Sequence, residues 1–124
     1  MRVFMTRAFG QFARKERLED RVLCEAIERA ERGIVDADLG GGVIKQRVAR
    51  PGQGRSGGYR TLIAFRSPSR AVVLFGFAKR DLDNIGNSDL KALRKAAGEM
   101  LGWTEAEADA MVAAGKWMEM ECDG

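Results

Sequence analysis

The chain has 124 residues, of which 45% are hydrophobic and 31% are charged, with a net charge of +3. This balance predicts one globular domain, residues 1–124, and the absence of histidine excludes Ser–His–Asp and Cys–His catalysis. The N-terminal segment lacks the apolar centre of a signal peptide, and the longest apolar run, 71–78, is too short to span a bilayer, so we expect a cytoplasmic protein.

The first third of the chain predicts a short strand followed by two helices. Residues 3–5 suit a strand, and Thr6 is placed to cap a first helix. Residues 17–32 predict a second helix, and Gly33 would end it in the left-handed conformation. The apolar residues of this helix recur at the spacing of one helix face: Val22, Leu23, Ala26, Ile27 and Ala30.

The middle of the chain changes to the period of strands. Residues 43–48, 59–66 and 71–78 predict three strands, separated by a Gly-rich turn at 50–58 and a tight turn at 67–69. The third strand is apolar on both faces, which favours a central position in the sheet. Strands joined by turns in this order predict an antiparallel meander.

The last third predicts two further helices. Asn87 or Ser88 would cap the first of them, and Thr104 and Glu107 match a capping box for the second, which Gly115 would end. Residues 116–124 could add a short strand or fray. The predicted fold class is therefore α+β, with N-terminal helices packed on a small twisted antiparallel sheet and C-terminal helices after it.

The two cysteines do not predict a metal site. Cys24 lies in the second predicted helix and Cys122 in the terminal tail, and their spacing does not match a metal site. In a reducing compartment we expect two free thiols rather than a disulfide. We expect no metal and no cofactor.

Positive charge is concentrated in the middle of the chain. Residues 39–80 carry nine basic and no acidic side chains, whereas the rest of the chain carries 12 basic and 18 acidic ones. Such a segment suits a phosphate backbone, because each neutralised phosphate releases a condensed counterion. The alternative is a basic surface that serves only solubility.

Four basic residues occupy strand positions from which they could act together. Lys45 and Arg47 share one face of the first strand of the meander, because side chains alternate along a strand. Arg60 lies at the start of the second strand, and Arg80 follows the third. Neighbouring strands lie about 5 Å apart, so these four side chains could surround one concave surface.

Such a surface suits phosphodiester chemistry on RNA. Attack by a ribose 2′-hydroxyl on the neighbouring phosphate builds negative charge on the phosphoryl oxygens, and fixed cations stabilise that charge as it develops. Arginine offers a planar fork to two phosphate oxygens at once. The candidate catalytic residues are therefore Lys45, Arg47, Arg60 and Arg80, although each could instead only position a phosphate.

The remaining basic residues of the segment are assigned to RNA binding rather than to chemistry. Those on or beside turns would hold phosphates: Arg50, Arg55, Arg66 and Arg70. Lys79, next to Arg80, is assigned to RNA binding as well. Tyr59, the only tyrosine, could stack on a base, give a phenolic proton or pack at a sheet edge. Three phenylalanines are expected in the core: Phe65, Phe75 and Phe77.

Two stretches of the sequence resemble a known family. GGVIKQRVARPGQGRSGGYRTLIAF (41–65) and VVLFGFAKRDLDNI (72–85), followed by a leucine-spaced helix, are similar to the RelE/HigB toxins of bacterial type II toxin–antitoxin systems, within the RelE/ParE superfamily. The similarity to the HigB-like branch covers roughly residues 3–101. Residues 102–124 would then be a C-terminal helical extension.

The resemblance implies a RelE-like fold, cleavage of mRNA in the ribosomal A site without a metal, and an antitoxin partner, expected to carry a helix-turn-helix. Lys45 and Arg47 match the strand lysines of the family, Arg60 the arginine of its GYR-like segment, and Lys79–Arg80 its GKR-like segment. The tyrosine that RelE carries shortly afterwards has no counterpart, because Ile85, Gly86 and Asn87 stand there.

Two other functions remain open at the level of sequence. A toxin of the related ParE kind would have the same fold, bind DNA gyrase and need no catalytic cluster. A module that binds RNA or an antitoxin without activity would fit the missing tyrosine.

Overall fold

The computed structural model confirms the α+β fold class. It describes residues 1–50, 52, 58–78 and 86–122. The helices and strands follow in the order β1 (Arg2–Thr6), α1 (Arg7–Glu16), α2 (Asp20–Glu31), β2 (Ala37–Gly40), β3 (Val43–Val48), β4 (Tyr59–Arg66), β5 (Arg70–Ala78), α3 (Asn87–Gly102), α4 (Glu105–Ala113) and β6 (Trp117–Met120).

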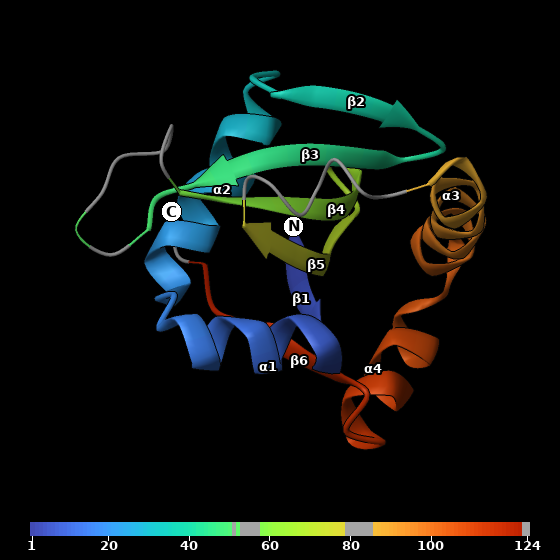
Figure 1. Cartoon of the computed structure of the whole chain (residues 1–124). Helices are drawn as coiled ribbons and strands as arrows, with labels where there is room; N and C mark the ends of the chain where they lie inside the picture. The colour runs from blue at the N-terminus through green and yellow to red at the C-terminus, as the bar shows by residue number, and fades with distance from the viewer. Residues whose placement is uncertain (51, 53–57, 79–85, 123–124) are drawn as a thin grey trace.

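In the described part of the chain, six strands form one sheet in the order β2-β3-β4-β5-β1-β6. The predicted meander is confirmed, because β3, β4 and β5 pair antiparallel in succession (Figure 1). β5 is central as expected, since β1 lies beside it and runs parallel to it. The strands β2 and β6 pair antiparallel with β3 and β1 and form the two edges of the sheet.

The helix ends follow the predicted capping chemistry with one difference. The Thr6 hydroxyl accepts the backbone N–H of Phe9 at 3.1 Å, and the Thr104–Glu107 capping box is present at the start of α4. The expectation that Asn87 or Ser88 caps α3 was wrong. The extended residue before the helix is Gly86, so Asn87 already belongs to the first turn.

The sheet separates two hydrophobic cores. The first core lies between α1 and α2 and one face of the sheet, and it contains Ile44, Val48 and Ile63. The core beneath α3 and α4 takes the other face, with Val43 and Leu62 buried there. Alternate residues of each central strand therefore enter different cores, and each strand presents a face to each pair of helices.

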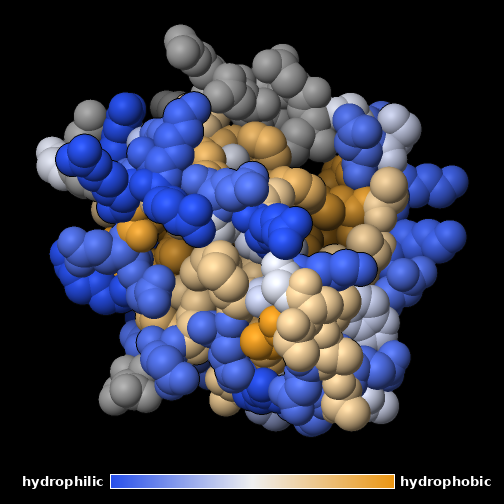
Figure 2. Space-filling model, turned by 90° about the horizontal axis from the view of Figure 1, so that it is seen from below, coloured by the Kyte–Doolittle hydropathy of each residue, from blue (hydrophilic) through white to orange (hydrophobic). Residues whose placement is uncertain are grey.

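Hydrophilic side chains form most of the surface on the side of α1 and α4. Figure 2 shows this side, where strongly hydrophobic side chains appear in gaps between hydrophilic ones. Four large hydrophobic residues are exposed in the described part of the chain: Met1, Ile34, Phe75 and Met118. Of these, Phe75 belongs to the central strand β5.

Arg70 is a buried structural residue and not a free cation. It is 3% exposed, and its guanidinium donates to the carbonyls of Met100 at 2.7 Å and Trp103 at 3.0 Å, and to the Glu105 carboxylate at 3.0 Å. The expectation that Arg70 holds RNA phosphates was wrong. The last carbonyls of α3 need donors, and Arg70 supplies them at the junction with α4.

The terminal segment, expected as a helical extension, contains α4 and also the strand β6. The indole of Trp117 on β6 lies 5.0 Å from the Phe4 ring on β1 and 5.3 Å from the Trp103 indole, measured between centroids. These aromatic contacts join β1, β6 and the end of α3 in one core. The expectation that the last residues either form a strand or fray is therefore resolved in favour of the strand.

The cysteines form a disulfide, and the expectation of two free thiols was wrong. Cys24 of α2 and Cys122 are bonded, with their Cα atoms 5.4 Å apart. The pairing of β6 with β1 carries the residues after Met120 back to α2, which brings together two thiols that lie 98 positions apart in the sequence. Nothing in the local sequence around either cysteine indicates this proximity.

An ion-pair cluster ties β1 to the terminal segment. Arg2 donates to Glu119 of β6 at 2.8 Å and to two carboxylates of α4, Glu105 at 2.6 Å and Asp109 at 2.8 Å. These hydrogen bonds lower the pKa of Glu119, and together with Arg70 they lower the pKa of Glu105. The cluster therefore favours the ionised form of both carboxylates in the folded state.

We expect this cluster to make the protein less stable in acid. A carboxylate whose pKa is lowered by folding contributes stability that is present above its unfolded pKa of 4.5 and is lost as pH falls through the lower folded value. An Arg2→Gln variant should therefore lose less stability than the wild type between about pH 7 and about pH 3. Urea midpoints at both pH values measure this, and parallel losses in the two proteins would contradict it.

Candidate nucleic-acid interface

Three of the predicted catalytic residues lie together on adjacent strands. Arg47 of β3 is paired in register with Arg60 of β4, and Lys45 is paired with Leu62. Side chains of paired residues point to the same face, so Lys45, Arg47 and Arg60 share the face on which α3 packs. We call these three residues the basic cluster.

The members of the basic cluster differ in exposure. Arg47 is exposed and Lys45 is half-buried, whereas Arg60 is only 6% exposed. The Arg60 guanidinium donates to the Gly58 carbonyl at 3.4 Å, so its direction is partly fixed by its own strand. The cluster thus combines one partly immobilised guanidinium with two more accessible cations.

The backbone beneath the cluster is held from the opposite face. The side chain of Asp36 accepts the backbone N–H of Arg47 at 2.7 Å, and buried Arg29 of α2 donates to the carbonyl of Arg47 at 2.5 Å. Gln46, which is fully buried, donates to the carbonyls of Ala26 and Ile34. These hydrogen bonds fix β3 against α2 and against the segment between α2 and β2, and Lys45 and Arg47 point to the other face of the strand.

Tyr59 lies on the opposite face from the basic cluster. It is 4% exposed in the core beneath α1 and α2, where its ring meets Phe12 edge-on and its hydroxyl donates to Glu16. The hydrogen bond to Glu16, followed by burial, raises the pKa of Tyr59. Of the roles that the sequence left open for Tyr59, the structure shows packing.

The other RNA-binding candidates do not join the cluster in the described structure. Arg50 lies over the Tyr59 ring, 5.4 Å from its centroid, and lines a hollow of about 220 Å³ beside the α1–α2 turn. Arg66 is exposed at the far end of β4. The remaining candidates, Arg55, Lys79 and Arg80, lie outside the described residues.

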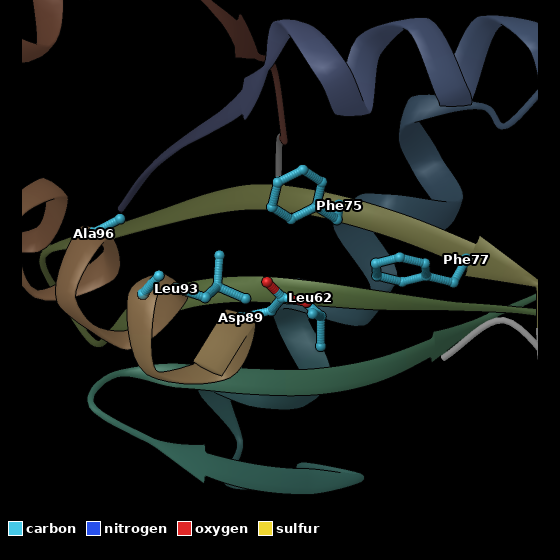
Figure 3. A pocket seen from close by; sticks show the side chains of 7 residues that line it. Leu62, Phe75, Phe77, Asp89, Leu93 and Ala96 are labelled. Carbon is cyan, nitrogen blue, oxygen red and sulfur yellow. The ribbon is translucent and has the colours of Figure 1, made fainter. Parts of the chain in front are cut away.

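Sequence reasoning missed an apolar cleft beside the basic cluster. It has a volume of about 460 Å³ and is lined by Leu62, Phe75 and Phe77 of the sheet and by Asp89, Ala92, Leu93 and Ala96 of α3. The expectation that Phe75 is a core residue was wrong, because it is 41% exposed, and Phe77 is half-buried. Both rings rise from β5 towards α3 (Figure 3).

The strand register was the only signal that could have located this cleft. Leu62 is paired with Lys45 on one side and with Phe75 on the other, and Arg60 is paired likewise with Arg47 and Phe77. The basic cluster and the two phenylalanines therefore share one face. The spacing of residues within one strand does not reveal this relation, because it depends on how three strands align.

The fold and this surface define a class of protein: a small α+β domain whose open sheet carries cations beside an apolar cleft. The family model described as RelE toxin of the RelE/RelB toxin–antitoxin system matches residues 1–120. The chain therefore belongs to the RelE toxin family and is the toxin of a toxin–antitoxin system, with a cognate antitoxin as its partner. No protein of curated function matches the sequence closely.

The described residues include no helix that is long and apolar enough to cross a membrane. They also include no group of three or more acidic or cysteine side chains placed to hold a metal ion.

Proposed function

We propose that this toxin is a ribosome-dependent mRNA endoribonuclease of the HigB-like branch, which acts in the cytoplasm and cuts without a metal or cofactor. The observation that carries the proposal is the basic cluster, in which Lys45, Arg47 and Arg60 meet on one face of two adjacent strands. Membership of the RelE toxin family supports a toxin that inhibits translation.

The cluster suits transesterification of RNA. The ribose 2′-hydroxyl gives its proton to water as its oxygen attacks the adjacent phosphorus, the bond to the 5′-oxygen breaks, and the 5′-oxygen takes a proton from water. The products are a 2′,3′-cyclic phosphate and a 5′-hydroxyl end. Negative charge grows on the phosphoryl oxygens during this step, and cations already held in place stabilise it without reorganising. The fixed backbone of β3 provides such preorganisation for Lys45 and Arg47.

Each member of the cluster has a distinct role in this proposal. Arg60, which is buried and directed by Gly58, presents its guanidinium fork to the phosphoryl oxygens. Arg47, which is exposed, holds the scissile phosphate or its neighbour, and Lys45 supplies a compact positive charge between the strand and α3. Arg80, which follows β5 in the sequence, is the fourth residue of the proposed catalytic set.

The remaining cations serve to hold the RNA in this proposal. Arg66 is exposed at the end of β4, beyond the cluster. Arg50 is exposed two residues after β3, over the Tyr59 ring, and would hold RNA away from the cluster. Arg55 and Lys79 add two positive charges to residues 39–80, which contain no acidic residue. The antitoxin, expected to carry a helix-turn-helix, would present acidic or shielding surface to this side of the sheet.

The test is a bacterial translation reaction that receives the purified toxin, with mRNA ends mapped afterwards. We expect new ends within translated codons, none on naked mRNA without ribosomes, and suppression when the product of the neighbouring reading frame is added. Intact mRNA together with accumulated gyrase–DNA breaks would overturn the proposal in favour of a ParE-like toxin. Intact mRNA with retained RNA binding would instead indicate an inactive binding module.

A further inference from the structure

The apolar cleft between β5 and α3 has features of a binding site. Its volume of about 460 Å³ lies within the range of small-ligand sites. Phe75 remains 41% exposed although it belongs to the central strand of the sheet. A large aromatic side chain left open beside a hollow is more typical of a recognition surface than of a core.

The shape of the cleft follows from the residues on its two sides. Figure 3 shows Phe75 and Phe77 on β5 facing Asp89 and Leu93 of α3, with Leu62 of β4 between them. The two phenylalanine rings have centroids 6.3 Å apart and are tilted by 39°, so they form one irregular aromatic wall. On α3, the small residues Ala92 and Ala96 leave the space in front of that wall open.

The cleft is continuous with the basic cluster. The register places Arg47, Arg60 and Phe77 in one row across three strands, and Lys45, Leu62 and Phe75 in the next row. Because neighbouring strands lie about 5 Å apart, the cations and the phenylalanines are separated by about 5 to 10 Å. This separation suits a single nucleotide, whose phosphate could contact the cations while its base stacks on the phenylalanines.

We propose that this cleft binds a nucleobase of the mRNA, which stacks on Phe75 and Phe77 while the adjoining phosphate contacts the basic cluster. The inference rests on the proposed nuclease function and names the part of the substrate that the site reads. Single-stranded RNA is bound in this way elsewhere, by aromatic stacking combined with a positive groove. RNA is the proposed occupant because cations and aromatic rings alternate across the same rows of strands, as the phosphates and bases of a nucleotide chain do.

Asp89 gives the cleft a chemical preference among bases. It lies in the first turn of α3, on the wall opposite the phenylalanines, and its carboxylate can only accept hydrogen bonds. Adenine and cytosine present an exocyclic amino group as a donor, guanine an amino group and N1–H, and uracil N3–H. The carboxylate therefore favours a base whose donor groups face α3 when it is stacked on the phenylalanines.

The test uses the full toxin in the translation reaction described above, with mRNA ends counted by codon. Phe75→Ala should lower the cleavage rate about tenfold, because stacking of one base on an aromatic side chain is lost. Phe75→Trp should retain most of the rate, because it keeps an aromatic face. Asp89→Asn should change the base composition at the cut sites, because an amide can also donate. Ile34→Ala, which removes another exposed apolar side chain, should leave rate and sites unchanged.

The outcomes separate this inference from the proposed function. If Phe75→Ala cuts mRNA at the wild-type rate and at the same codons, the cleft assignment is wrong and the nuclease function still stands. A wild-type protein that makes no cuts would overturn the nuclease function itself. If Phe75→Ala loses only its binding to the antitoxin, the cleft is a protein-docking site and the inference is wrong. Circular dichroism of each variant shows whether a loss of activity reflects unfolding.

Discussion

Replacing Lys45 and Arg47 together by alanine should reduce mRNA cleavage by about 100-fold or more while leaving the fold intact. Removal of a single preorganised group that stabilises transition-state charge costs about 100- to 1,000-fold in rate. Neither residue is fully buried, and their side chains face away from the hydrogen bonds that fix β3 to α2. The effect should therefore appear in the cleavage rate and not in the urea midpoint.

A matched control separates local chemistry from net charge. Arg14→Ala with Lys15→Ala removes the same two positive charges from exposed positions on α1. This variant should cut mRNA within about twofold of the wild type, since transition-state stabilisation acts at the reacting atoms. Equal losses in both double variants would show that the toxin depends only on its overall charge, and the assignment of Lys45 and Arg47 would fail.

Replacing Arg70 by methionine should destabilise the protein by about 3 kcal/mol, which corresponds to a fall of about 10 °C in Tm. Methionine keeps most of the buried volume but donates no hydrogen bonds. The carbonyls of Met100 and Trp103 would then lie without the donor that Arg70 provides at the α3–α4 junction. Loss of these hydrogen bonds from a charged and buried donor accounts for most of the expected destabilisation.

Arg66 provides the control for this experiment. It is paired in register with Arg70 across the β4–β5 turn but is exposed to solvent. Arg66→Met should change Tm by no more than about 2 °C, because an exposed substitution away from special contacts costs about 0.5 kcal/mol or less. If Arg70→Met and Arg66→Met have the same Tm, the buried hydrogen bonds of Arg70 do not stabilise the α3–α4 junction.

The central strands were predictable from sequence because their signals are local. The alternation in residues 43–48 and the turn residues around them predict β3 with the bounds that the structure shows, and residues 59–66 predict β4 equally well. The cap at Thr6 and the capping box at Thr104 were predictable for the same reason. In each case the chemistry that forms the element lies within a few residues.

The parts that could not be predicted depend on contacts between distant segments. The parallel pairing of β1 with β5 and the bond between Cys24 and Cys122 join residues 68 or more positions apart. Arg70 resembled its neighbours in the basic segment, and only the return of α3 over the turn buries it. For the candidate site, sequence located three of the cations, whereas the cleft at Phe75 required the register of three strands.

The placement of β1 has a consequence for the order in which the protein can fold. This strand is synthesised before the other five strands described, but its neighbours in the sheet are β5 and β6, which emerge from the ribosome much later. The sheet is thus built from contacts of large sequence separation, and such contacts form slowly because long loops must close first. While residues 117–120 are still inside the ribosome, one edge of β1 lacks its strand partner. The sheet of this toxin is therefore completed only after almost all of the described chain has been released.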